Sequence, residues 1–323
     1  MEAGNDTAPE QFPVPNFVSY NVIMLAFFVV PVTVVNTLTI AGLILDKVTP
    51  VAIRLVIANL LGASLIVIFA LYLEHLTSLA LIGGNRDQPP REFCSFIIWL
   101  LAGGGASRLV FTATFSIVVF VIVKGGTKAV SNVGLAISIV VLWIVTFLLS
   151  APTLSLYSVG VQYIGGAACY PRAVEGVTNG TVNRVFVILW AILFGVIPLV
   201  ITVTMPLVTM CFIQRHNITG DVKFNKAMVK FALFLILGIF FNFFGQVVPP
   251  LIALANENIQ NSALVYLAFI LMNISLIPTP VLIYVYLAGA RTKVKELLLC
   301  YPIRKHKGDT SSSEQSDKPV LPK

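Results

Sequence analysis

The chain has 323 residues, of which 57% are hydrophobic and only 11% are charged. Soluble domains carry roughly 25% charged residues, so this composition excludes an ordinary soluble globular protein. Lysine and arginine number 21 against 14 aspartates and glutamates, which gives a net charge of +7. Whether this positive charge indicates binding to nucleic acid or to a membrane surface depends on where the basic residues lie along the chain.

Seven apolar segments, each long enough to cross a lipid bilayer, follow one another along the chain. Each is expected to be an α-helix, because hydrocarbon offers the backbone no other hydrogen-bond partners. The sequence therefore predicts an all-α fold, a seven-transmembrane helix bundle over residues 19–287. The predicted spans are 19–45, 51–73, 95–124, 131–157, 184–213, 227–255 and 262–287.

The basic residues are distributed unevenly between the connections. With the N-terminus outside, sixteen of the 21 lysines and arginines lie on the inner side, four lie outside and Arg108 lies within the third span. This excess sets the orientation and assigns the charge to the cytoplasmic membrane face, not to nucleic acid. We therefore expect a multi-pass plasma-membrane protein with an extracellular N-terminus.

Both chain ends fit this orientation. Residues 1–18 are acidic and lack the apolar core of a cleavable signal peptide, so they are expected to be an extracellular N-terminus. Asn5 and Asn179 stand in glycosylation sequons on the predicted outer side.

Residues 288–300 alternate basic and apolar side chains, which predicts a short amphipathic helix on the inner leaflet. Cys300 at its end is a candidate for palmitoylation, with an unmodified thiol as the alternative. Residues 301–323 are polar and serine-rich, which predicts a disordered cytoplasmic tail.

Nothing in the sequence points to catalysis or to a metal. The histidines are scattered, the four cysteines lack metal-ligand spacing, and no span offers a nucleophile with a nearby base. We therefore expect neither an enzyme nor a bound cofactor or metal ion.

Short motifs in five spans resemble those of one receptor family. They include "VVNTLTIAGLIL" in the first span, "ANLLGAS" in the second and "LIPTPVLIYVYL" in the seventh. In this order, and with seven spans, they resemble the rhodopsin-like G-protein-coupled receptors over residues 19–300. The residues that carry the likeness are Asn36, Ser64, Trp143, Pro198 and the pair Thr279-Pro280.

The resemblance implies a disulfide and a switch. Cys94, which opens the third span, would pair with Cys169 in the following outer loop, and an extracellular location permits this bond. At the inner end of the third span the family has an acid–arginine–aromatic triplet, whose arginine contacts the G protein. Here the triplet is Val118, Val119 and Phe120. The electrostatic latch of the inactive family member cannot form in this chain.

The sixth and seventh spans also depart from the family pattern. The sixth places Phe240 at the family's phenylalanine and, by spacing, Phe244 at its tryptophan, while Gln246 replaces the proline. In the seventh span Tyr284 comes one residue later than the family's tyrosine.

Arg108 lies fourteen residues beyond Cys94, near the middle of the membrane at 1.5 Å per residue. A buried arginine is costly without partners, so it should face the bundle interior. The resemblance places it where many members bind a sodium ion, and Ser64 stands in place of the aspartate that would hold that ion. We expect the guanidinium to replace the ion; alternatively, Arg108 faces an open aqueous cavity and binds an anionic ligand. The expected acceptors are backbone carbonyls and the side chains of Ser64, Asn36, Asn273 and Ser275.

The resemblance places the ligand pocket between the outer halves of the third, fifth, sixth and seventh helices. No acidic residue stands on the outer turns of the third helix, which disfavours an amine ligand. The seventh span has no lysine that could form a Schiff base with retinal. The three glycines 103–105 indicate close helix packing and are also expected to leave room beside the third helix. The apolar lining favours a small lipophilic or chemosensory molecule. An interfacial aromatic belt is the alternative for the aromatic residues. The expected pocket residues are Glu74, Trp99, Leu100, Gly103, Gly104, Phe186, Trp190, Phe244, Gln246 and Tyr266.

Three functions remain open. The first is an orphan receptor that transduces an extracellular ligand to a heterotrimeric G protein. The second is a receptor-like membrane protein without conventional G-protein coupling, which Val119 favours. The third is a small seven-helix transporter, which would be expected to show several interior charges and internal repeats, whereas only Arg108 is interior.

Overall fold

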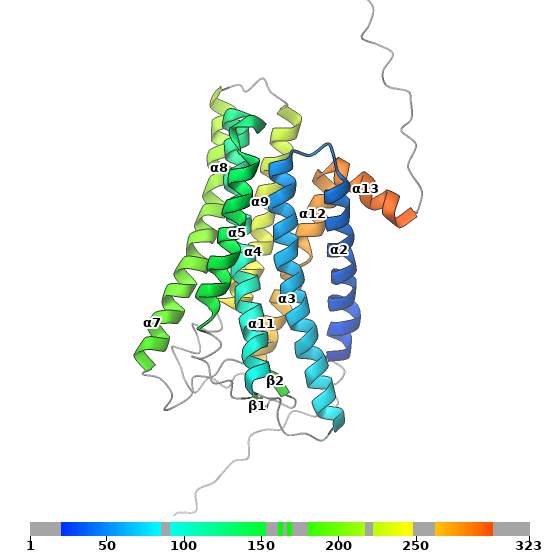
Figure 1. Cartoon of the computed structure of the whole chain (residues 1–323), viewed down its shortest axis with the longest axis vertical. Coiled ribbons are helices and arrows are strands. Elements are labelled where there is room, and N and C mark those ends of the chain that lie inside the picture. Colours follow the sequence, from blue (N-terminus) through cyan, green and yellow to red (C-terminus); the bar gives the residue numbers. More distant parts are fainter. Residues whose placement is uncertain are drawn as a thin grey trace, which may run out of the picture.

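The structure is a computed structural model that describes residues 21–84, 91–152, 161–163, 167–169, 180–216, 222–247 and 262–299. The predicted all-α class is confirmed for this part of the chain, apart from one antiparallel hairpin, β1 (Val161–Tyr163) with β2 (Ala167–Cys169). Figure 1 shows the helices side by side along the long axis of the molecule, with the hairpin at the lower end. The sequence did not predict the hairpin.

The helical elements follow the predicted order. They are η1 (Met24–Val29), α2 (Val30–Leu45), α3 (Val51–Gly84), α4 (Arg91–Gly125), η2 (Thr127–Ala129), α5 (Asn132–Ser150), α7 (Gly180–Ala191), η3 (Ile192–Val196), α8 (Ile197–His216), α9 (Val222–Gln246), α11 (Ser262–Ser275), α12 (Pro278–Tyr286) and α13 (Ala288–Leu299). η1 leads directly into α2, and α7, η3 and α8 form one continuous helical run.

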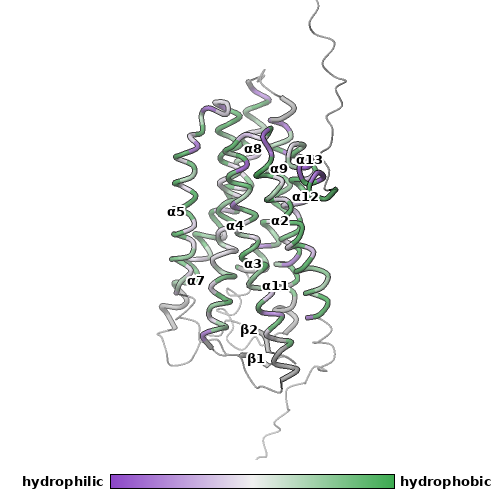
Figure 2. The backbone as a smooth tube through the Cα atoms, turned by 45° about the vertical axis from the view of Figure 1, so that its right-hand side comes forward, coloured by the Kyte–Doolittle hydropathy of each residue, from purple (hydrophilic) through white to green (hydrophobic). Residues whose placement is uncertain are grey.

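In the described part of the chain, six helices are long and apolar enough to cross a membrane, or seven if a bent pair near the C-terminus counts as one span. Figure 2 shows hydrophobic residues along most of the helical length and hydrophilic residues in α13. The chain is therefore a multi-pass membrane protein. The six helices are Asn21–Leu45, Val51–Thr77, Glu92–Gly125, Asn132–Ser150, Val185–Arg215 and Asn225–Gly245.

Helix α4 occupies the centre of the arrangement. It contacts α3, α5, α8 and α9, and α9 in turn contacts α11 and α12. Helix α2 contacts both α3 and α12, so the last helices return to the first and close a ring around α4. Residues on α4 consequently have neighbours from most of the chain.

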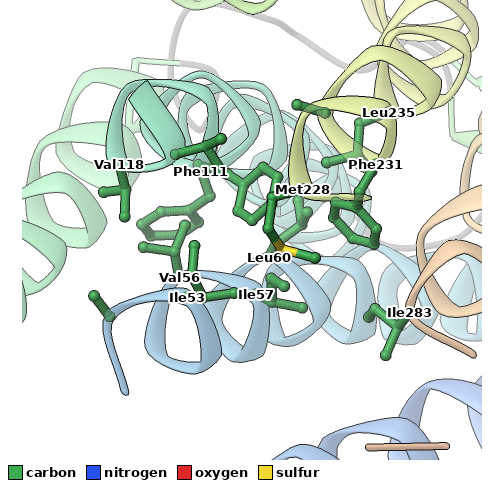
Figure 3. Close-up of a cluster of buried hydrophobic side chains, with 14 of the residues drawn as sticks. Ile53, Val56, Ile57, Leu60, Phe111, Val118, Met228, Phe231, Leu235 and Ile283 are labelled. Atoms are coloured by element: carbon green, nitrogen blue, oxygen red, sulfur yellow. The ribbon is translucent and has the colours of Figure 1, made fainter. Parts of the chain in front are cut away.

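The largest cluster of buried apolar side chains lies between α3, α4 and α9 (Figure 3). Phe115 of α4 and Phe231 of α9 meet edge to face with ring centroids 5.0 Å apart. Within a bilayer, lipid tails are as apolar as these side chains, so close van der Waals packing holds the helices together.

The glycines of α4 are sites of close helix approach. A Cβ atom added to Gly103 would lie 2.8 Å from the ring of Phe147 on α5, and one added to Gly104 would lie 3.0 Å from Val67 on α3. The expectation that these glycines leave room for a ligand is wrong at both positions, because neighbouring helices fill the space.

Several predicted boundaries differ from the observed ones. Helix α3 continues to Gly84, eleven residues beyond the predicted end at 73. Helix α5 ends at Ser150, before the predicted 157, and the seventh predicted span is broken between α11 and α12. The break precedes Pro278 and Pro280, which lack the backbone N–H groups that would continue the helix.

The predicted amphipathic segment is a helix, α13, which turns by 102° from the preceding helix (Figure 1). Ala290 and Val294 are buried against the bundle, while Leu297, Leu298 and Leu299 are exposed. Predictions for residues 1–18, Asn5, Asn179, Cys300 and residues 301–323 lie outside the described residues.

Candidate functional site

Arg108 lies on α4 at the centre of the bundle, with only 4% of its surface exposed. Its Nη1 atom donates to the Oδ1 atom of Asn242 at 3.0 Å and to the Oγ atom of Ser275 at 2.7 Å. Its Nη2 atom donates to the backbone oxygen of Ser275 at 2.5 Å. The predicted interior position is confirmed, and so is Ser275 as an acceptor.

Ser275 can accept these bonds because it is the last residue of α11. A helix leaves its final carbonyl groups without intrahelical partners and carries partial negative charge at that end. The proline pair that follows prevents α12 from continuing the same helix. The guanidinium therefore caps the broken end of α11.

Asn242 joins a third helix to this network. Its Oδ1 atom accepts from Arg108, and its Nδ2 atom donates to the backbone oxygen of Gly105 at 3.3 Å. Helices α4, α9 and α11 are thus linked by polar contacts within an otherwise apolar interior. Asn242 is not among the residues predicted from sequence, although a lone amide in the apolar run "IFFNFFG" is itself a sign of an interior polar contact.

Ser64 and Asn36 do not contact Arg108, which corrects two of the predicted acceptors. The Ser64 hydroxyl donates to the Leu60 carbonyl at 3.1 Å, and the Asn36 amide donates to the Val32 carbonyl at 2.8 Å. Both side chains are buried, yet their donors are satisfied within their own helices. Asn273 is also buried, but it makes no described bond to Arg108.

A small cavity adjoins the network. It has room for about one water molecule, so the alternative expectation of an open aqueous cavity at Arg108 is wrong. Its lining consists of Leu60, Arg108, Thr112, Leu235, Gly238, Ile239, Asn242 and Thr279.

Phe240, Phe244 and Tyr284 lie on exposed helix faces, so the expectation that Phe244 lines a pocket is wrong. Phe240 and Phe244 are 47% and 39% exposed and pack on each other, with ring centroids 4.4 Å apart. Residues four apart share a helix face, and the buried Asn242 marks the opposite, inward face. Tyr284 is 42% exposed, whereas Tyr286 packs against Phe231.

Three of the expected pocket residues, Trp99, Gly103 and Trp190, lie against the last turn of α5. The Nε1 atom of Trp99 donates to the Phe147 carbonyl at 3.1 Å, and that of Trp190 donates to the Ser150 hydroxyl at 3.2 Å. Both tryptophans thus face the neighbourhood of α5. Glu74 is buried on α3, and the side chains of Gln246 and Tyr266 lie outside the described residues.

The C-terminal end of α4 is apolar and tightly packed. Val118 and Val119 are 5% and 2% exposed and belong to one buried cluster with Met228 and Val229 of α9. Phe120 contacts Phe212 of α8, with ring centroids 6.1 Å apart. An apolar contact between α4 and α9 therefore occupies the place where the resembled family has charges.

The residues of the remaining motifs are buried or hydrogen-bonded between helices. Trp143 of α5 donates to the Oδ1 atom of Asn59 on α3 at 2.8 Å. Thr279 and Pro280 are buried at the start of α12, and Pro198 is buried near the start of α8, just after the π-helical η3. Widened π-turns are frequent where a helical bond ladder is disturbed, as it is by a proline.

Cys94 is buried and disulfide-bonded. Strand β2 ends at Cys169 and contacts α4, the helix of Cys94. The pairing of these two cysteines stays a prediction, since the side chain of Cys169 lies outside the described residues.

The sequence matches no family model, and no curated protein is significantly similar to it. In the described part of the chain no cluster of histidine, cysteine, aspartate or glutamate could hold a metal ion. Any functional conclusion therefore depends on the motifs and on the geometry around Arg108.

Proposed function

We propose that this chain is a rhodopsin-like G-protein-coupled receptor of the plasma membrane. The observation that carries the proposal is the Arg108 network, which joins α4, α9 and the proline-broken end of α11 at the centre of the bundle. Such a receptor works by moving its helices relative to one another, and a shared polar centre makes three helices respond together.

Under this proposal α11 and α12 form the seventh crossing, broken at Pro278, and α13 lies along the inner membrane surface. The connections that follow α2 and α4 then lie at the same end of the bundle as α13 (Figure 1). Most described basic residues lie at this end, which supports its assignment to the cytoplasm. They are Lys47, Arg54, Lys124, Lys128, Arg215, Lys223, Lys226, Lys230, Arg291, Lys293 and Lys295.

The inactive state would be held by apolar contacts in place of an ionic latch. Opening α9 away from α4 would expose Val118, Val119 and Met228 to cytoplasmic water. Exposing one such side chain costs about 1.5–3 kcal/mol, so a few of them can match the strength of a lost ion pair. A ligand that favours the open arrangement would have to supply this free energy.

The test is basal recruitment of a panel of engineered G proteins in cells, for wild type and Val119→Arg. An arginine among Val118 and Met228 would be buried without a partner, so the open arrangement should be favoured and recruitment should rise. Val119→Ala, which keeps the site apolar but buries less surface, serves as the comparison and should raise recruitment less than Val119→Arg does. Surface expression is measured by labelling the N-terminus on intact cells.

The same apolar contact favours a second function, a receptor-like membrane protein without conventional G-protein coupling. The two candidates differ in the recruitment assay. Silence of wild type, Val119→Arg and Val119→Ala with every G protein, at good surface expression, would favour the second. For either candidate we propose a small lipophilic or chemosensory ligand that enters from the outer side or from the bilayer.

A further inference from the structure

We infer that the corner between α12 and α13 binds an anionic phospholipid, with the headgroup against Arg291 and Lys295 and an acyl chain along the exposed face of α12. The inference concerns the lipid contacts of the chain and holds whether or not the chain couples to a G protein. The corner exists because α13 turns by 102° from the preceding helix and leads away from the bundle where α12 ends (Figure 1).

Arg291 and Lys295 place two positive charges on one face of α13. They are four residues apart, and like charges at this spacing repel each other within a helix. Arg291 also stands at the end of the first turn, where a helix carries partial positive charge and where α13 has no acidic residue. Both features raise the free energy of the helix by itself, and an anionic group bound between the two side chains would lower it.

Neither cation is neutralised by a carboxylate of the described residues. Glu296 is paired with Lys293, whose Nζ atom lies 2.6 Å from its Oε2 atom. The carboxylate of Asp46 packs against Gly289, but it is buried, accepts from the Thr49 hydroxyl at 2.5 Å and forms no ion pair with α13. The positive charge that α13 leaves without a carboxylate therefore lies on a single face.

Lys295 also shows that this face adjoins the lipid. Its Nζ atom lies 6.0 Å from the centroid of the Tyr284 ring, at the outer limit of a cation–π contact. Tyr284 is exposed on α12, in the helix pair that forms the seventh crossing under the proposed topology. The ammonium group of Lys295 is thus held beside a lipid-facing ring, at the level where a phospholipid headgroup meets the hydrocarbon.

The exposed face of α12 is apolar over most of the depth of one leaflet. Ile277, Val281, Tyr284 and Val285 are exposed and follow one another at helical spacing. From Ile277 to Val285 this face extends about 12 Å at 1.5 Å per residue, whereas one leaflet holds about 15 Å of hydrocarbon. An acyl chain can therefore lie along α12 while its headgroup reaches α13.

The apolar surface favours a lipid over a soluble anion. Leu298 and Leu299 are exposed three and four residues beyond Lys295, so the same face of α13 passes from charged to apolar. A free phosphate ion would contact only the cations. The cytoplasmic leaflet, where the proposed orientation places α13, is rich in anionic lipids such as phosphatidylserine.

The experiment measures lipid binding by native mass spectrometry of the purified full chain in detergent, titrated with phosphatidylserine or phosphatidylcholine. Phosphatidylserine should bind with the lower Kd and saturate. Lys295→Gln should raise this Kd about fivefold, the contribution of one basic residue at an anionic lipid surface. Lys293→Gln is the matched control, because it removes the same charge from the same helix but from the residue paired with Glu296. It should leave the Kd near the wild-type value.

Two further measurements define the site. Arg291→Gln should raise the Kd for phosphatidylserine as Lys295→Gln does. A phosphatidylserine that carries a photoactivatable group in its acyl chain should label residues 277–285 of the wild-type chain.

Four results would each overturn the inference. They are equal Kd values for the two lipids, equal losses in Lys295→Gln and Lys293→Gln, labelling confined to other helices, and binding of the chain-free headgroup glycerophosphoserine as tightly as the lipid. None of them depends on a receptor assay, so failure of this inference and failure of the proposed function remain distinguishable.

Discussion

Arg108 shows how one residue can organise the middle of a membrane protein. Its charge cannot reach water from mid-span, and its acceptors come from Asn242 and Ser275 on two other helices. The sequence places Arg108 in the interior because a lone charge in an apolar segment must avoid lipid. Which of several polar residues receives its hydrogen bonds is decided by helix rotation, which the sequence does not display.

Ser275→Ala tests this network at the residue scale. The substitution removes one neutral acceptor from a buried cation and should destabilise the protein by about 2 kcal/mol, a decrease in Tm of about 5 °C. Ser64→Ala is the control, because that hydroxyl bonds only the Leu60 carbonyl of its own helix. It should shift Tm by less than about 1 °C. Equal losses in the two variants would mean that Ser64, not only Ser275, supports Arg108.

At the scale of the elements, the departures from expectation concern helix faces and helix breaks. Phe244 was assigned to the ligand pocket, yet it lies with Phe240 on the exposed face of α9, while the inward face carries Asn242 and Ile239. Aromatic residues surround Asn242 on both sides in the sequence, and the assignment followed motif spacing instead of the position of this one amide. The break before α12 was foreseeable from its two prolines, while the length of α3 was not.

Close packing between α4 and α5 gives a test at this scale. Gly103→Ala would place a methyl group 2.8 Å from the Phe147 ring, and such overpacking should cost about 1–3 kcal/mol. Gly62→Ala is the control, because the nearest side-chain atom, on Trp143, would lie 4.0 Å from the new methyl group. That change should be neutral or stabilising by up to about 1 kcal/mol, since alanine favours helix. Thermal unfolding of the two variants compares them, and a Gly103→Ala protein as stable as Gly62→Ala would show that α5 can shift to accommodate the methyl group.

For the whole molecule, charge and hydropathy together give orientation. Basic residues gather at the end of the bundle that carries α13, and β1 and β2 lie at the other end. Positive charge is retained on the cytoplasmic side of a membrane, so the hairpin end is expected to be extracellular.

Glycosylation tests this orientation. In a eukaryotic host, Asn5→Gln and Asn179→Gln should each increase the mobility of the protein on a gel, because each removes one glycan from the predicted outer side. Asn217→Gln is the control and should cause no change, since the sequon Asn217-Ile-Thr lies between the fifth and sixth predicted spans, on the predicted inner side. Treatment with peptide N-glycosidase should bring all variants to the same mobility. A mobility change in Asn217→Gln alone would reverse the proposed orientation.

The order and helical nature of the apolar segments, and the interior position of Arg108, could be predicted from sequence because a bilayer leaves the backbone and a buried charge few choices. Which residues come together in the candidate site could not be predicted from the sequence. Trp99 and Trp190 were assigned to one pocket, and both donate hydrogen bonds to the last turn of α5, a helix that was not assigned to that pocket. Asn59 and Trp143, quoted in separate motifs, proved to be partners.

The sequence by itself determined that this chain is helical, multi-pass and charged mainly at one end. Only the tertiary structure decided which face of each helix turns inward and which polar groups meet there. The physical reason is that lipid-facing and core-facing positions are both apolar in a membrane protein, so hydropathy does not separate them. Each helix takes the rotation about its axis that gives the closest packing and hydrogen-bond partners for its buried polar groups. Those partners lie on other helices, far away along the chain.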